Sequence, residues 1–249
     1  MSGHSKWKTN KGRKTAADAA KGAVYTKLIK EIVVVARAGG GSPDTNSRLR
    51  MLIAKAREAN MPSDNVKTAI KRGTGELPGI VYETVMYECY GPSGIAIMIE
   101  TLTDNKNRTS AELRNILSKK GGNLSGSVAW MFSKKGYILV DKPINMKEDD
   151  LMDVVLEAGC EDMKSDEKSY EITCPAQDLE KIKSALKDKS INWQTAEVTM
   201  VPSSTIKVTG SEAKQVLELI DTLEEHEDVQ NVYANFDIPD DILEQAGTN

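Results

Sequence analysis

The first residues of the chain combine cations with an aromatic ring in a pattern suited to binding a polyanion. Trp7 stands between two lysines, and further positive charges follow before the first acidic residue, Asp18. Ammonium groups neutralise phosphates, and an indole face can stack on a base or a sugar. The alternatives are that Trp7 only pins this segment onto its own domain, or that the segment is a solvated tail without a ligand. The candidate nucleic-acid contacts here are His4, Lys6, Trp7, Lys8, Lys11, Arg13 and Lys14.

A second polar group, at residues 103–109, lies between an expected strand and an expected helix. Helix N-termini present free N–H donors that attract phosphate, and a neighbouring lysine and arginine would add charge. Asp104 and Asn105 could instead satisfy those donors as helix caps, and the sequence leaves both interpretations open. The secondary candidates for nucleic-acid binding are Asn105, Lys106, Asn107 and Arg108.

Residues for catalysis, metal binding or cofactor binding are sparse. Cys89, Cys160 and Cys174 are widely spaced, and only two histidines could join them, whereas a zinc site needs about four converging ligands. The Gly39–Gly41 run follows a helix and lacks the downstream Gly-Lys-Ser/Thr of a phosphate-binding loop, so we expect a hinge there. Dinucleotide-binding and hydrolase signatures are also missing. We therefore expect no catalytic residue, no metal, no cofactor and no enzymatic activity.

Charge is distributed unevenly along the chain. The first 75 residues hold sixteen Lys and Arg against five Asp and Glu, although the whole chain has a net charge of −4. A polarised surface selects partners by sign. The basic end therefore predicts a polyanionic partner, and nucleic acid is the leading one.

Hydrophobic periodicity predicts three helices within residues 15–73. Apolar residues recur at i, i+3, i+4 and i+7 from Tyr25, then from Leu49, then from Val66, with breaks at the glycine run and at Pro62. Cations lie off these apolar stripes, and Arg48/Lys55 and Arg50/Arg57 pair at i+7 on the flanks of the second helix. The cations expected to grip phosphates are Lys27, Lys30, Arg48, Arg50, Lys71 and Arg72.

From residue 82 the pattern changes to short strands alternating with helices. We expect strands at 82–90, 94–103 and 127–132 with a helix at 107–120, and then the order β-α-β-β-α-β through residue 201. That order is typical of a ferredoxin-like α+β domain. A strand at 205–209, a helix at 211–225 and a strand at 229–236 would complete a second domain of this kind, in which the first is inserted.

The predicted fold class is thus multidomain α+β: a three-helix N-terminal domain followed by two ferredoxin-like domains, one inserted in the other. The expected boundaries are residues 1–78 for the basic arm and helical domain, 79–133 plus 203–249 for the middle domain, and 134–202 for the inserted acidic domain. The longest wholly apolar stretches are five residues, against roughly 20 needed to cross a bilayer. With no secretory signal pattern either, we expect a cytoplasmic protein, and a monomer because no heptad repeat appears.

Several motifs together resemble the YebC/PmpR family over essentially the full length. What the resemblance implies is three domains without known catalysis, a basic N-terminal motif falling on His4, Lys6 and Trp7, and an Asp-Asn-x-Asn-Arg-Thr loop falling on residues 104–109. This sequence departs from the family within the arm, at Lys8-Thr9-Asn10 and Gly12. The matching segments are 3–7, 25–29, 36–41, 59–62, 69–73, 90–92, 102–109 and 121–130.

The resemblance implies a DNA-binding transcriptional regulator, the usual description of bacterial members. The alternative is a ribosome-associated translation factor that binds ribosomal or transfer RNA, with ribosomal proteins as further partners, and relieves stalled elongation. No helix-turn-helix with a base-reading helix is visible, and lysine-rich contacts go to phosphates rather than bases. If six phosphates are engaged, affinity for duplex DNA should fall with salt at a log–log slope of about −5.

Overall fold

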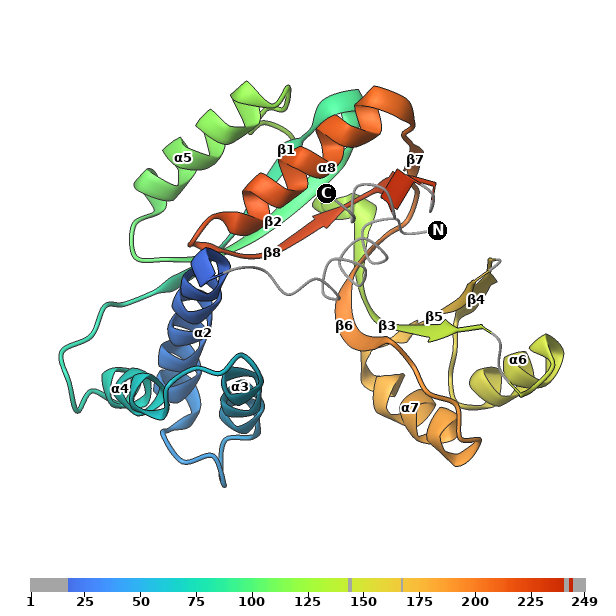
Figure 1. Ribbon diagram of the computed structural model, residues 1–249, viewed down its shortest axis with the longest axis horizontal. Helices are drawn as coiled ribbons and strands as arrows, with labels where there is room; N and C mark the ends of the chain where they lie inside the picture. Colours follow the sequence, from blue (N-terminus) through green and yellow to red (C-terminus); the bar gives the residue numbers. More distant parts are fainter. Residues whose placement is uncertain (1–17, 143–144, 167, 240–241, 244–249) are drawn as a thin grey trace. The chain divides into compact units, whose positions relative to one another are not determined.

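The computed structural model describes residues 18–142, 145–166, 168–239 and 242–243 (Figure 1). These residues form two compact units. Of the described residues, one unit contains 18–127 together with Ser211–Val232, and the other contains those of Val128–Gly210 and those from Tyr233 onward. The α+β class expected from the sequence is confirmed, with helices first and mixed helices and strands after them.

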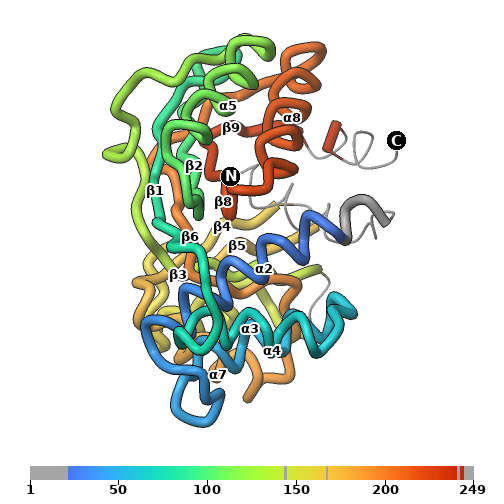
Figure 2. Tube along the Cα trace, turned by 90° about the vertical axis from the view of Figure 1, so that its left-hand side faces the viewer, coloured from blue at the N-terminus to red at the C-terminus, as the bar shows by residue number. Residues whose placement is uncertain are grey.

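The first unit opens with a helical segment made of α2 (Asp18–Gly39), α3 (Ser47–Glu58) and α4 (Ser63–Thr74). These helices lie together in Figure 2, with α2 packed against both of the others. Their apolar stripes meet in a core of their own, which includes Ile32, Leu49 and Ala56. The three predicted helices are therefore present, and α3 and α4 have 12 residues each.

Local polar groups and glycines set the helix boundaries. The Asn46 side chain accepts a hydrogen bond from the Leu49 N–H at 3.0 Å and so caps the start of α3. Gly75 ends α4 in the left-handed conformation, with φ of 84°. Residues 75–82 then run to the first strand without helix or strand structure.

The same unit continues as a sheet segment, a three-stranded sheet covered by two helices. The strands are β1 (Glu83–Tyr90), β2 (Ala96–Thr103) and β8 (Val229–Ala234), in the order β1-β2-β8, with β1 and β2 antiparallel. Helices α5 (Lys106–Lys119) and α8 (Gly210–Glu225) lie on the same side of this sheet (Figure 1). The central strand β2 is almost wholly buried, which its apolar sequence predicts.

The second unit holds a four-stranded antiparallel sheet in the order β4-β5-β3-β6. Its core includes Ile138, Leu151 and Ile182. The β-α-β-β-α-β order expected for this region is present, and a short parallel pair, β7 with β9, follows it. The elements are β3 (Phe132–Asp141), α6 (Glu148–Glu157), β4 (Asp162–Ser165), β5 (Ser169–Pro175), α7 (Leu179–Asp188), β6 (Thr195–Pro202), β7 (Ile206–Lys207) and β9 (Phe236–Asp237).

One strand expectation and one pairing expectation were wrong. Residues 127–131 contain the 3₁₀ turn η2 (Ala129–Met131), and a single strand, β3, begins at Phe132 and runs through Gly136. Glycine fits there because an added Cβ would lie 2.5 Å from the Cys174 Sγ, so the residue marks close packing rather than a strand end. The expected strand near 205–209 pairs with β9 instead of joining β1, β2 and β8.

The middle sheet of the described chain therefore has three strands, and the ferredoxin-like class of that domain stays a prediction. The division into three domains with the boundaries given above also stays a prediction, since the helical and sheet segments share one compact unit. Every helix in the described ranges is too short or too polar to cross a bilayer.

Candidate nucleic-acid interface

The N-terminal candidates fall outside the described residues. Their role in binding stays a prediction from the sequence. They are His4, Lys6, Trp7, Lys8, Lys11, Arg13 and Lys14.

Four of the exposed cations on α3 and α4 have no ion pair or side-chain hydrogen bond among the described residues: Lys55, Arg57, Lys71 and Arg72. Lys71 and Arg72 were expected as phosphate contacts, and both are exposed in the last turn of α4. Lys55 and Arg57 are exposed in the last turn of α3 and were missed as site residues, although their i+7 pairing with Arg48 and Arg50 signalled the same exposed flanks. Within the described part of the chain, no hydrogen bond or ion pair engages these four side chains, so their charges face solvent.

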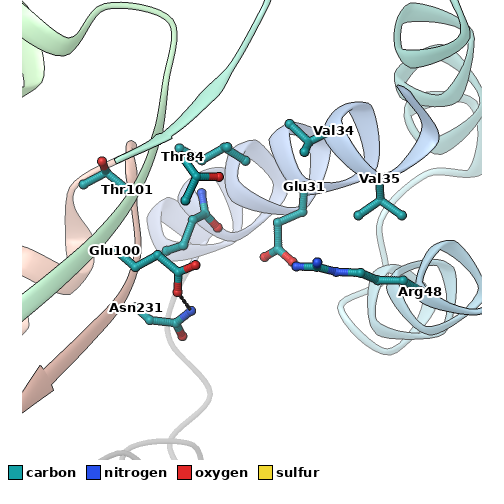
Figure 3. A pocket seen from close by; sticks show the side chains of 10 residues that line it. Glu31, Val34, Val35, Arg48, Thr84, Glu100, Thr101 and Asn231 are labelled. Atoms are coloured by element: carbon teal, nitrogen blue, oxygen red, sulfur yellow. Dashed lines mark hydrogen bonds between the residues drawn. The ribbon is translucent and has the colours of Figure 1, made fainter. Parts of the chain in front are cut away.

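Two further predicted cations on α3 are exposed but partly occupied. Arg50 donates hydrogen bonds to the carbonyl oxygens of Pro43 and Asp44, both at 2.9 Å, and so holds the loop before α3. Arg48 faces the carboxylate of Glu31 on α2 (Figure 3). Both add positive charge to the surface of α3. In addition, Arg50 holds the preceding loop and Arg48 faces a carboxylate of α2.

Lys27 and Lys30 of α2, which were predicted to contact phosphates, instead contact oxygen atoms of the protein itself. Lys27 donates to the carbonyl oxygen of Glu224. Lys30 forms an ion pair with Asp228 and also donates to the Glu227 carbonyl oxygen at 3.1 Å. Only 6% of Lys30 is exposed, so in this arrangement it cannot reach a phosphate. The expectation that it lies on a solvent-exposed face does not fit the structure, because its partner lies 198 residues further along the chain.

Asp228 is the centre of a buried polar cluster that joins three elements. Its side chain is fully buried and accepts hydrogen bonds from Thr109 Oγ1 at 2.7 Å and from Arg108 at 3.0 Å, besides Lys30. Burial by itself would raise the pKa of Asp228, but the hydrogen bonds from Lys30, Thr109 and Arg108 outweigh it and hold that pKa well below its usual range. The carboxylate is therefore charged and fully engaged.

The 103–109 loop matches the capping alternative. The Asn105 side chain accepts from the Arg108 N–H at 3.1 Å and caps α5. Lys106 forms an ion pair with Glu83, and Arg108 pairs with Asp104 as well as with Asp228. Of the four secondary candidates only Asn107, which is exposed, has no such role among the described residues. The loop thus serves the fold of the sheet segment.

A small cavity of about 60 Å³ lies where α2 meets the sheet segment (Figure 3). Glu31 and Glu100 both line it, and Asn231 donates to Glu100 at 2.9 Å. Burial raises the pKa of Glu31, Lys55 and Arg48 lower it, and the nearby Glu100 raises it further. The Nε2 of Gln230, another lining residue, is buried without a hydrogen-bond partner in the described structure. Val34, Val35 and Leu102 line the cavity as well, so charged and polar groups lie beside apolar ones at this junction.

Glu112, His226 and Asp228 come close enough together to suggest a metal site. Both imidazole nitrogens of His226 are already used: one lies 2.9 Å from Glu112 Oε2, and Nδ1 accepts from the Asp228 N–H at 3.1 Å. The three groups therefore complete the turn between α8 and β8, and they give no support for a metal centre.

Comparisons with known proteins cover almost the whole chain. Residues 5–76 match the family model described as "TACO1/YebC protein N-terminal domain", and residues 82–236 match "TACO1/YebC second and third domain". A protein of Natranaerobius thermophilus is 52% identical over 98% of this chain and 99% of its own length, and one of Dictyoglomus turgidum is 52% identical over the same shares. Both are named "Probable transcriptional regulatory protein". The crystal structure of a conserved hypothetical protein from Aquifex aeolicus is similar, with a TM-score of 0.71 and 42% identity over 89% of this chain and 92% of that one.

Proposed function

Because this chain belongs to the TACO1/YebC family, we propose that it is a non-enzymatic regulator of gene expression that binds DNA. The names of its relatives from Natranaerobius thermophilus and Dictyoglomus turgidum support a role in transcription. The observation that carries the binding proposal is the group of exposed, unengaged cations on α3 and α4: Lys55, Arg57, Lys71 and Arg72.

The proposed mechanism is a grip on the phosphate backbone. The four cations, with Arg48 and Arg50 beside them on α3, would neutralise phosphates, and the N-terminal basic segment would add contacts and a stacking indole from Trp7. Lysine and arginine contacts to phosphates position a protein without reading the sequence. We therefore expect strong salt dependence, with a log–log slope of about −5 if six phosphates are engaged, and weak sequence preference.

A charge-reversal experiment tests the surface. Changing Lys55, Arg57, Lys71 and Arg72 to Glu should weaken binding to a 30-base-pair duplex at least tenfold and flatten its salt slope. The matched control changes four exposed lysines elsewhere, Lys119, Lys187, Lys189 and Lys214, to Glu, which gives the same net charge. An equal loss of duplex affinity in both variants would show that only net charge matters. It would contradict the assignment of this surface to nucleic-acid binding.

The N-terminal segment needs its own variant. Lys6→Glu, Lys8→Glu and Arg13→Glu together should also weaken duplex binding and flatten the salt slope. Unchanged duplex binding would contradict the assignment of this segment to the nucleic-acid interface.

Crosslinking in cells followed by sequencing of the bound nucleic acid tests the choice of DNA. Reads at discrete promoters would support the proposal. Reads dominated by ribosomal RNA, together with comigration with ribosomal particles in a sucrose gradient, would replace it with the translation-factor alternative.

A further inference from the structure

The junction between the helical segment and the sheet segment differs from the inside of either. The helical segment has its own hydrophobic core, and only its edge reaches the junction, where Val35 also lines the cavity. What joins α2 to the sheet segment includes many polar groups: the cluster around Asp228 and the small cavity of mixed lining to which Glu31 and Glu100 contribute. Polar junctions between parts that have their own cores are the usual places for movement.

The lysines of α2 are held at this junction by oxygen atoms of one turn. We call residues 224–228, with the sequence Glu-Glu-His-Glu-Asp, the acidic corner. Its carbonyl oxygens at Glu224 and Glu227 accept from Lys27 and Lys30, and its Asp228 carboxylate pairs with Lys30. An array of oxygen acceptors with negative charge is the same chemistry that a phosphate backbone offers to lysine.

The junction also contains groups that disfavour the contact between the two segments. Glu31 and Glu100 line the same cavity, and the charge of Glu100 raises the pKa of Glu31. The buried Nε2 of Gln230 has no hydrogen-bond partner among the described residues, which costs free energy when a polar atom is shielded from water. Separation of the two segments would hydrate all three groups. This hydration would offset part of the free energy needed to separate Lys30 from Asp228.

The chain connection allows such an opening. In the described residues, the helical segment is joined to the sheet segment through residues 75–82, which have no helix or strand structure. Eight residues can span roughly 26 Å when extended. Gly75 and Gly79 lie in this linker, and Gly75 already adopts a φ of 84°. The linker is long enough for the three helices to move as one body once its own contacts with them are released: the Leu77 N–H donates to the Lys71 carbonyl oxygen at 3.1 Å, and Tyr82 packs against the helical core.

We propose that the acidic corner is an internal mimic of a phosphate backbone, which holds Lys27 and Lys30 in the free protein and is displaced from them by nucleic acid. Displacement lets the helical segment swing away from the sheet segment and adds two cations to the cationic surface of α3 and α4. The inference rests on the proposed function, because it describes how the same binding surface is regulated.

Distance measurements between the two segments test the movement independently of binding. Spin labels at Asn65→Cys on α4 and Ser118→Cys on α5 report on it, since both positions are exposed. Cys89, Cys160 and Cys174 are buried, so labelling of the native protein is selective. The test variant is Asp228→Asn, which keeps the shape of the side chain and removes its charge. The matched control is Glu225→Gln, an exposed acid of the same corner.

The expected result is one short distance in the unaltered protein and in Glu225→Gln, and a longer, broader distribution in Asp228→Asn. Saturating a 30-base-pair duplex should lengthen the distance in the unaltered protein too. The measurement with duplex needs no substitution at Asp228, so it tests the movement even if Asp228→Asn does not fold. The same distance with and without bound duplex overturns the inference.

Binding measurements test the mimic itself. Asp228→Asn should bind the duplex more tightly than the unaltered protein, and its log–log salt slope should be steeper by up to about 1.8, the value for two additional phosphate contacts. Adding Lys27→Gln and Lys30→Gln should abolish that increment. A variant that opens without any change in slope overturns the mimic. If neither protein binds duplex while Asp228→Asn still opens, the proposed function fails and the movement stands as a separate finding.

Discussion

Gly73 of α4 lies directly against the main chain of α2 at Val33: a Cβ built on Gly73 would lie 2.5 Å from the Val33 carbonyl oxygen and 2.7 Å from the Ala36 Cβ. No atom can occupy that position without moving one helix. Both neighbouring groups belong to the rigid part of α2, so a larger residue at 73 must separate α4 from α2.

Gly73→Ala should therefore destabilise the helical segment by about 1–3 kcal/mol, the usual range for overpacking a close contact. Gly22→Ala is the control, because Gly22 lies in α2 with nothing within 4 Å of the added Cβ. That change should stabilise by about 0.5–1 kcal/mol through better helix propensity. Urea unfolding followed by circular dichroism measures both, and equal effects of the two substitutions would contradict the packing argument.

Asn46 should tolerate no substitution well, since it uses both ends of its amide. Its oxygen caps α3, while its Nδ2 donates to the carbonyl oxygens of Gly40 at 2.9 Å and Val35 at 3.1 Å. Asn46→Ala should cost about 2 kcal/mol or more, because it removes the cap and the hydrogen bonds to both carbonyl groups. Asn46→Asp retains the cap but places a carboxylate against two carbonyl oxygens in a buried site, so it should be similarly destabilising. An Asp variant as stable as the unaltered protein in urea would show that only the cap matters.

The ion pair of Asp228 should make stability depend on pH. Its folded pKa is lowered, so its contribution is fully present above its unfolded pKa of about 3.9 and is lost as pH falls towards the folded value. Asp228→Asn removes this contribution and leaves Lys30 and Arg108 facing a neutral group, which should cost about 3–5 kcal/mol at pH 7. The difference in stability between the two proteins should shrink below pH 4. A constant difference from pH 7 to pH 2.5 would contradict this assignment.

The cysteines should react slowly in the folded protein. Burial raises the pKa of Cys89 to about 12 and that of Cys160 to about 11, so little thiolate forms at neutral pH. A thiol reagent at pH 7.5 should therefore modify them many times faster in denaturant than in buffer. Rapid modification of the native protein would show that one of these sites opens easily.

Local pattern was sufficient to predict most of the helices. The apolar stripes placed α2, α3 and α4 within a few residues of their bounds, because each helix buries one face against the other two. Long-range pairing was not predictable in the same way. The partner of Lys30 is Asp228, 198 residues away, and a lysine on a basic helix gives no local sign that it will be buried.

The candidate site was predictable only where local pattern determines it. The i+7 pairs on α3 indicated exposed cations, and Lys71 and Arg72 are exposed as expected. The Asp-Asn-x-Asn-Arg-Thr loop attracted a phosphate-binding interpretation because caps and anion sites use the same residue types. Only the structure shows that Asn105 and Arg108 already have protein partners.

The hydrogen bond from the Leu102 N–H of β2 to the carbonyl oxygen of Asp228, at 2.7 Å, has a consequence for biosynthesis. Strand β8, which pairs with β2, leaves the ribosome about 126 residues after it, which takes roughly 6–25 s at ordinary elongation rates. During that interval the apolar β2 lacks its neighbour on one edge, while the intervening four-stranded unit emerges. An unpaired edge strand is a site where chains aggregate, so this edge of β2 stays exposed to that hazard until β8 has emerged.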